Sequence, residues 1–177
     1  MSELLVLALG NVLCGDDGAG VVALARLRSR YSIDADLLDG GTLGLSLLGY
    51  LQSAESAILV DAIAADAPAG TLVRVEGDDV GTAVAQRLSP HQVGVLDLLD
   101  GARLLGGNPK RIVLVGIVPE RIELGVGLSP PVSAALDDLV EAVAAEVARM
   151  GFGVRRGGDD AQRDADFLHR ILGVQGG

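Results

Sequence analysis

The sequence predicts a single α/β domain of three layers, in which a mostly parallel central sheet of about five strands is flanked by helices. Three observations predict this fold class. Short apolar runs alternate with segments of helical periodicity, which is typical of strands that are connected through helices. The first run, Leu4–Leu9, is continuously apolar, as expected for a strand buried on both faces. The chain has 177 residues, 49% of them hydrophobic, and these suffice for one core of this kind.

The expected strands are short runs of mainly Leu, Val, Ile and Ala. The second strand ends at the sequence Asp39-Gly40-Gly41, and the third ends at Asp61. The fourth follows a turn that contains Pro68 and Gly70. The expected ranges are residues 4–9, 35–38, 57–60, 71–75 and 112–118, and the last of these is the final strand of the domain.

Helices are expected between and after these strands. The first begins near Asp17-Gly18, a second passes through Leu45, Leu48 and Leu51, and a third spans residues 91–105. The final helix begins with Ser129 as its N-cap and Pro130 in its first turn. Apolar spacing puts these side chains on the buried faces of the first and final helices: Val21, Leu24, Leu27 and Tyr31, then Val132, Leu136, Leu139, Val140, Val143, Val147 and Met150. Residues 77–90 are expected to form a loop.

The composition changes after Met150. Residues 151–166 are rich in Gly, Arg and Asp and contain too few apolar side chains to hold a fold. We therefore expect a folded domain over residues 1–150 and a flexible polar tail over residues 151–177. Within the tail, Phe167, Leu168, Ile171 and Leu172 form one short amphipathic turn that could dock on the domain.

The composition also argues against two classes of partner. A net charge of −10 disfavours nucleic acids, because phosphate contacts need clustered Lys and Arg, and it disfavours anionic membrane surfaces. The single cysteine, Cys14, has no internal disulfide partner, which fits a reducing compartment. The first apolar run is too short for a signal peptide or a membrane span, so a cytoplasmic protein is expected.

Polar residues gather where the expected parallel strands end. In open α/β sheets, ligands bind at the carboxyl ends of the strands. Asp16 and Asp17 follow the first strand, Asp39 follows the second, Asp61 follows the third, and His91 stands at a helix start. The fold is therefore expected to bring these five residues towards one rim.

Each of these residues also has a simpler interpretation. Asp16 and Asp17 could cap a helix, Asp61 could be an ordinary strand-end residue, and His91 could be structural or solvated. Together they favour a site, because crowded carboxylates repel one another unless a cation or a proton intervenes. Two carboxylates and an imidazole suit a borderline divalent metal such as nickel, zinc or manganese, and the residue types do not choose among these metals.

Other chemistries find less support. The spacing of Gly15, Gly18 and Gly20 does not match a nucleotide-binding glycine motif, and two aspartates occupy the place that a phosphate would approach. Acidic neighbours raise the pKa of a thiol, so Cys14 is a poor nucleophile. His169 lies in the expected tail. The motifs of serine hydrolases and of zinc proteases with two helical histidines are missing from the sequence.

Taken in order, five motifs closely resemble those of the hydrogenase maturation endopeptidases. The resemblance covers the chain from about Leu4 to Met150 and excludes the tail. The motifs occupy residues 10–20, 39–44, 60–62, 89–94 and 127–129, and they are Gly-Asn-Val-Leu-Cys-Gly-Asp-Asp-Gly-Ala-Gly, Asp-Gly-Gly-Thr-Leu-Gly, Val-Asp-Ala, Ser-Pro-His-Gln-Val-Gly and Gly-Leu-Ser.

The resemblance implies a set of site residues. The family's metal ligands, two acidic residues and a histidine, match Asp17, Asp61 and His91, which are thus the candidate metal-binding and catalytic residues. The first position is Glu in some members and Asp here, so this carboxylate reaches one methylene less far. Asp39 matches a family motif beside the site, together with Gly40 and Gly41, as a shaping residue and a candidate electrostatic participant. Cys14 matches no functional position.

The implied activity is removal of the C-terminal extension from a nickel-iron hydrogenase large-subunit precursor once nickel is inserted. In this view the precursor presents the nickel, which is not a permanent cofactor, and the site senses it. Whether the metal also polarises the scissile bond is open. The alternatives are a related acidic-site peptidase of the spore-germination type and a non-catalytic chaperone that binds metal or precursor. The oligomeric state is open, and a monomer is plausible.

Overall fold

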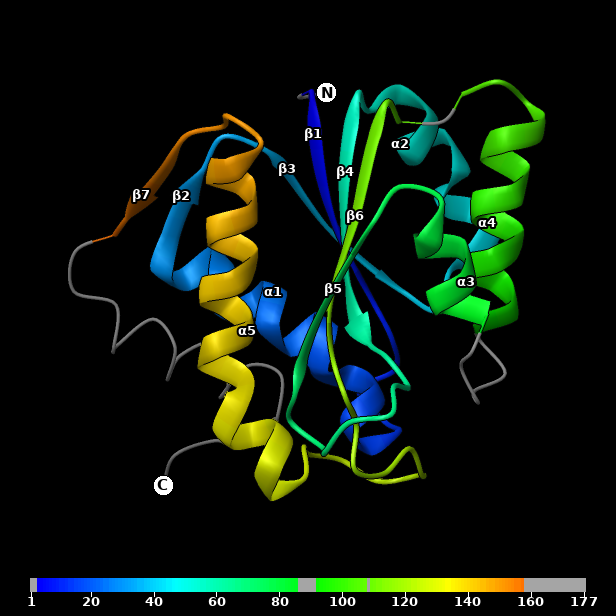
Figure 1. Ribbon diagram of the computed structural model, residues 1–177. Coiled ribbons are helices and arrows are strands. Elements are labelled where there is room, and N and C mark those ends of the chain that lie inside the picture. The colour runs from blue at the N-terminus through cyan, green and yellow to red at the C-terminus, as the bar shows by residue number, and fades with distance from the viewer. Residues whose placement is uncertain (1–2, 86–91, 108, 158–177) are drawn as a thin grey trace, which may run out of the picture.

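The computed structural model describes residues 3–85, 92–107 and 109–157 (Figure 1). Its strands are β1 (Leu4–Leu9), β2 (Tyr31–Ile33), β3 (Asp36–Gly41), β4 (Ser56–Ala62), β5 (Leu72–Glu76), β6 (Arg111–Ile117) and β7 (Val154–Arg156). Its helices are α1 (Ala19–Arg30), α2 (Leu48–Ser53), α3 (Asp79–Ala85), α4 (Gln92–Leu104) and α5 (Pro130–Arg149), with two short 3-10 helices, η1 (Gly15–Gly18) and η2 (Gly44–Leu47).

Five strands form the central sheet in the order β3-β1-β4-β6-β5. β1 pairs in parallel with β3 and β4, and β4 pairs in parallel with β6. The edge strand β5 runs antiparallel to β6. The four parallel strands therefore end at one edge of the sheet, the lower end in Figure 1, which we call the carboxyl edge. The mostly parallel five-stranded sheet is confirmed.

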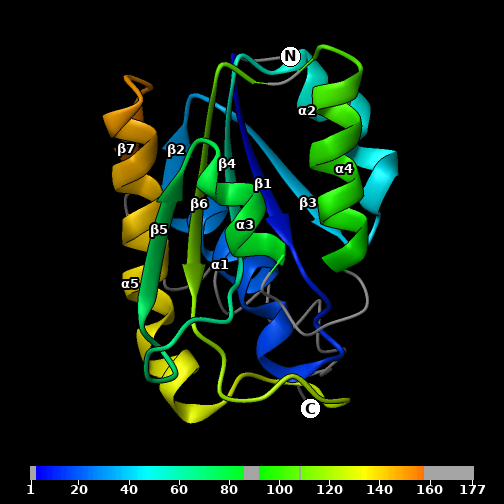
Figure 2. The same ribbon diagram turned by 45° about the vertical axis from the view of Figure 1, so that its right-hand side comes forward.

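Successive side chains along the strands point to opposite faces of the sheet and form two apolar clusters, one on each face. The even-numbered residues of β1 enter the first cluster and the odd-numbered residues enter the second. Helices α1 and α5 cover the first face, and α2, α3 and α4 cover the second (Figures 1 and 2). All of β1 is buried because both faces are covered, which explains its uninterrupted apolar run. The three-layer α/β class is confirmed.

The final helix follows its prediction closely. Pro130 stands in the first turn of α5, and the helix buries Val132, Leu136, Leu139, Val140, Val143 and Val147. Met150 follows the last helical residue and is partly buried. Ser129 is the N-cap by position, but its side chain makes no capping hydrogen bond. Within the described residues, no helix is both long and apolar enough to cross a bilayer.

One predicted loop contains a helix. The sequence analysis assigns residues 77–90 to a loop, which is wrong for Asp79–Ala85, because these residues form α3. Val80 and Val84 lie one helical turn apart and are buried in the cluster with α4. Two buried residues one turn apart are too short a pattern to distinguish a helix from a loop. Residues 86–91 lie outside the described residues.

A second, two-stranded antiparallel sheet of β2 and β7 was not predicted. Tyr31, expected on the face of the first helix, begins β2, and Val154–Arg156 belongs to the expected flexible tail. Phe152 and Val154 pack against the cluster with α1 and α5, so the predicted domain end at Met150 is too early. Three-residue strands lack the apolar run by which strands are recognised. The expected turn over residues 167–172 lies outside the described residues.

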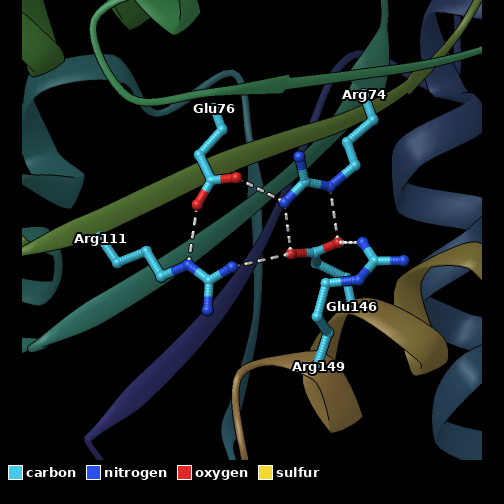
Figure 3. Close-up of polar contacts among 5 residues, drawn as sticks. All are labelled: Arg74, Glu76, Arg111, Glu146 and Arg149. Carbon is cyan, nitrogen blue, oxygen red and sulfur yellow. Dashed lines mark hydrogen bonds and ion pairs between the residues drawn. The ribbon is translucent and has the colours of Figure 1, made fainter.

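The antiparallel edge of the sheet is attached to α5 through a buried carboxylate. Glu146 is 1% exposed and receives two hydrogen bonds from Arg74 of β5, at 2.8 and 2.9 Å (Figure 3). Arg149 also contacts Glu146, and Arg111 of β6 lies 3.8 Å from it. Glu76 joins the two strand arginines at 2.7 and 2.9 Å. The Arg74 hydrogen bonds lower the pKa of Glu146 against the opposing effect of burial.

Replacing Glu146 by Gln should destabilise the fold and make its free energy of unfolding depend less on pH in the acid range. The variant keeps the side-chain size but leaves three arginines without their shared anion, so we expect a loss of roughly 1–3 kcal/mol at pH 7, discounted because the arginines are partly solvated. A carboxylate with a lowered pKa adds stability above its unfolded pKa of about 4.3 and loses it as the pH falls further. Urea unfolding at pH 7 and at about pH 3.5 should show the difference between variants shrinking with acid.

The matched control is Glu141→Gln on the same helix. Glu141 is exposed and accepts hydrogen bonds from the Tyr31 hydroxyl at 2.6 and 2.7 Å. An exposed contact of this kind is worth at most about 1 kcal/mol. Equal losses in the two variants would contradict the special role of Glu146.

Candidate active site

The loop after β1 turns back on itself and presents two aspartates at the carboxyl edge. Gly10 has a φ of 122°, and a Cβ there would lie 1.9 Å from the Asp17 carbonyl oxygen. The backbone N–H of Asn11 donates to Oδ2 of Asp17 at 2.6 Å. The chain then forms η1 over Gly15–Gly18, and α1 follows from Ala19. The expected helix start at Asp17-Gly18 is thus a 3-10 turn that leads into the α-helix.

Gly20 brings the start of α1 directly onto two strand ends. A Cβ at this position would lie 2.3 Å from the Val60 carbonyl oxygen and 2.8 Å from that of Leu9. Any side chain would therefore push the helix away from β1 and β4. Gly18 is similar, since its Cβ would lie 2.7 Å from Cα of Val12. The glycines of this motif serve close backbone packing, which accounts for them without a phosphate.

Asp61 lies in β4 at the same edge and is fully buried. Ala57, Leu59 and Ile63 enter the cluster on the α4 face, so strand alternation puts Asp61 on that face too. Its β6 neighbour in the sheet is Gly116, where a Cβ would collide with Ile63. Asp17 is also fully buried, and η1 contacts β4. Two of the predicted ligands are therefore buried carboxylates, Asp61 near the end of β4 and Asp17 in η1, which contacts β4.

Asp39 lies one strand further along the edge. β3 extends through Asp39–Gly41, beyond the strand end predicted at Leu38. Gly10 donates to the Gly41 carbonyl oxygen at 3.0 Å, which joins this motif to the loop after β1. The Asp39 side chain is exposed, and its Oδ1 accepts a hydrogen bond from the Gly41 N–H at 3.0 Å. These contacts agree with a shaping role.

His91 lies outside the described residues. Helix α4, whose first residue Gln92 follows it, begins at the carboxyl edge (Figure 1). Within the described part of the chain, no three His, Cys, Asp or Glu side chains gather as a metal site. The set of Asp17, Asp61 and His91 therefore remains a prediction.

Asp16 has a role that the sequence analysis did not identify. Its carboxylate is fully buried and accepts four hydrogen bonds: from the N–H groups of Ser129 at 2.6 Å, Glu120 at 2.9 Å and Arg121 at 3.1 Å, and from the Ser129 hydroxyl at 2.8 Å. Burial raises the pKa of Asp16, but these hydrogen bonds outweigh it and lower the pKa. The donors stand more than 100 residues away in the sequence, so only the fold reveals them.

Exposed apolar side chains surround this edge. Leu13 is 54% exposed in the first loop, and Leu124 and Val126 are 89% and 70% exposed in the segment between β6 and α5. The two segments are joined where the Gly125 N–H donates to the Leu13 carbonyl oxygen at 2.9 Å. Cys14, which forms a β-bridge with Gly125, is a free cysteine of intermediate exposure. We call Leu13, Ile122, Leu124 and Val126 the apolar rim.

Comparison with known proteins assigns the family. A family model described as Hydrogenase maturation protease matches residues 21–146, more than half of the 177 residues. The chain belongs to the hydrogenase maturation protease family. Among its relatives, Hydrogenase 2 maturation protease of Escherichia coli strain K12 is 37% identical over 153 residues, covering 84% of this chain and 93% of the relative. The hydrogenase expression/formation protein HupD of Rhodobacter capsulatus is 38% identical over 159 residues, covering 88% and 76%.

Solved structures of the family have the same fold. The hydrogenase maturating endopeptidase HybD from Escherichia coli superimposes with a TM-score of 0.82 at 34% identity, covering 88% of this chain and 98% of that one. The nickel-iron hydrogenase maturation protease HybD from Thermococcus kodakarensis gives a TM-score of 0.66 at 30% identity, covering 83% and 99%. This hydrogenase maturation protease is thus an endopeptidase with the family's α/β fold.

Replacing Gly20 by Ala should disturb the carboxyl edge. The added methyl group meets backbone oxygens of both β1 and β4, so the start of α1 must move, and we expect a loss of about 1–3 kcal/mol in unfolding free energy. The control is Gly49→Ala in α2, where nothing lies within 4 Å of the new atom, and a gain of up to about 1 kcal/mol is expected. Urea unfolding measures both changes, and a neutral Gly20→Ala would argue against this packing.

Proposed function

We propose that this protease removes the C-terminal extension from a nickel-iron hydrogenase large-subunit precursor after nickel insertion, and that Asp17, Asp61 and His91 recognise the nickel. The observation that carries the proposal is the full burial of two carboxylates at the carboxyl edge, Asp61 in β4 and Asp17 in η1, which contacts β4. Family membership supplies the reaction class, and relatives such as Hydrogenase 2 maturation protease of Escherichia coli support a hydrogenase precursor as the substrate.

The physical basis of recognition is electrostatic. Carboxylates that are buried near one another disfavour the charged state unless a cation is present. A nickel ion carried by the precursor would remove that repulsion on docking, so the loaded precursor gains an interaction that the empty one lacks. Two carboxylate oxygens and an imidazole nitrogen also form a donor set that suits a borderline divalent ion. In this proposal nickel is part of the substrate, and its task is recognition.

The apolar rim supports a protein substrate. Leu13, Leu124 and Val126 lie exposed beside the loop that carries Asp17. A small charged substrate would not use this surface, whereas a chain segment of a folded precursor could cover it. The family match favours this proposal over the spore-germination peptidase and over the non-cleaving chaperone.

A direct experiment compares nickel-loaded and nickel-free full-length precursor. Wild-type protein should produce a single mass loss in the loaded precursor only. Asp61→Asn keeps the side-chain size but removes the charge, so cleavage should fall by at least about 100-fold. Mass spectrometry of the precursor measures both effects.

Glu146→Gln is the control, because it removes a buried carboxylate away from the carboxyl edge and should cleave at the rate expected for its folded fraction. Tight binding of the precursor without any mass loss would support the chaperone instead. Equal cleavage of loaded and empty precursor would contradict nickel recognition.

Asp39→Asn separates shaping from electrostatics. The amide oxygen of Asn still accepts the Gly41 hydrogen bond, and only the charge is lost. Because this carboxylate is exposed and screened by solvent, we expect less than about a 10-fold reduction in the rate of precursor cleavage. A loss as large as that of Asp61→Asn would identify Asp39 as an electrostatic participant in the reaction.

A further inference from the structure

The two adjacent aspartates of η1 have different surroundings. Asp16 receives its four hydrogen bonds from residues 120–129, which we call the 120–129 segment. Asp17 instead accepts from the Asn11 N–H, in the loop after β1. Successive side chains of a 3-10 helix project about 120° apart, so the orientation of one residue fixes that of the next. Holding Asp16 therefore also holds Asp17.

We propose that Asp16 is a positioning residue, which binds the 120–129 segment across η1 and thereby fixes both Asp17 and the apolar rim for substrate recognition. The inference deepens the proposed function and rests on it for the role of Asp17. Asp16 is buried against the segment and turned away from solvent, so it acts through its neighbours without contacting the substrate.

Backbone contacts flank this carboxylate on both sides. The Asp16 N–H donates to the Arg121 carbonyl oxygen at 3.2 Å, and the Gly15 N–H donates to that of Gly125 at 2.8 Å. The carboxylate supplies acceptors for three N–H groups and one hydroxyl, and the two donors of Ser129 are buried. A carboxylate suits this position because all four partners donate and it can only accept.

The segment held in this way carries part of the apolar rim. Ile122, Leu124 and Val126 are all exposed, and Gly125 pairs with Cys14 beside Leu13. Release of Asp16 would therefore loosen two features together, the direction of Asp17 and the surface beside it. Both features concern binding of the precursor, so the Michaelis constant KM is the parameter that should respond.

The test uses Asp16→Asn and Ser129→Ala, with Glu146→Gln as the matched control. Ser129→Ala removes one hydrogen bond and keeps the three N–H donors, so it stays testable if Asp16→Asn does not fold. The KM for nickel-loaded precursor should rise by about 10-fold in Ser129→Ala and by up to about 100-fold in Asp16→Asn. Ser129→Thr, which keeps the hydroxyl, should restore most of the wild-type KM.

A purely structural role would give a different result. Partial unfolding lowers the concentration of active enzyme and so the apparent kcat, but leaves KM unchanged, which is the behaviour expected of Glu146→Gln. Unchanged KM in both folded variants at Asp16 and Ser129 would overturn the proposal.

A second measurement does not depend on the substrate. Amide hydrogen exchange of Glu120, Arg121 and Ser129 should accelerate in Ser129→Ala by more than in Glu146→Gln, in which any increase reflects only the lower global stability. If exchange accelerates in the Ser129→Ala variant but the wild-type protein does not cleave the precursor, the proposed function fails. The role of Asp16 in holding the segment would then still stand. Unchanged exchange in a folded Asp16→Asn variant would refute the positioning role itself.

Discussion

The carboxyl edge depends on one close approach of backbone to backbone. Because Gly20 has no side chain, the start of α1 can press against the carbonyl oxygens of Leu9 and Val60. This packing places η1, with its two aspartates, over the ends of β1 and β4. An acidic turn that would otherwise be solvated is thereby dehydrated, and its carboxylates need partners that suit an anion. The burial of these two carboxylates therefore determines which partners they need.

The fold supports such burial at two places in different ways. Asp16 is held by backbone N–H groups and a hydroxyl, whereas Glu146 is held by arginines. The two carboxylates contact opposite ends of α5. Asp16 binds Ser129, which precedes the first residue of the helix, and Glu146 stands in the last turn, about 25 Å away along the axis. Asp16 thus attaches the start of α5 to the carboxyl edge, and Glu146 attaches the end of α5 to β5.

The fold was predictable where a buried element has a long apolar pattern in the sequence. β1 and α5 bury many residues in sequence, so their apolar patterns identify them. Among its described side chains, α3 buries only Val80 and Val84, and in β7 only Val154 is partly buried, so neither element has a long apolar pattern. For the site, strand order predicts that Asp17 and Asp61 share an edge. The partners of Asp16 were not predictable, because they are mostly backbone groups of a distant segment, and a backbone N–H carries no signature in a sequence.

These contacts also bear on the metal recognition that we propose for the edge. In many small metal sites the ion organises its own ligands, and binding is coupled to folding. Here the glycine packing, the Asp16 hydrogen bonds and the two apolar clusters are contacts within the protein chain that hold the described part of the edge. The precursor then has to order little of the site when it binds. Little of the binding free energy is therefore lost to ordering, and more of it can distinguish the loaded from the empty precursor. Under the proposed function, an edge held by these internal contacts would meet a nickel ion that the precursor presents.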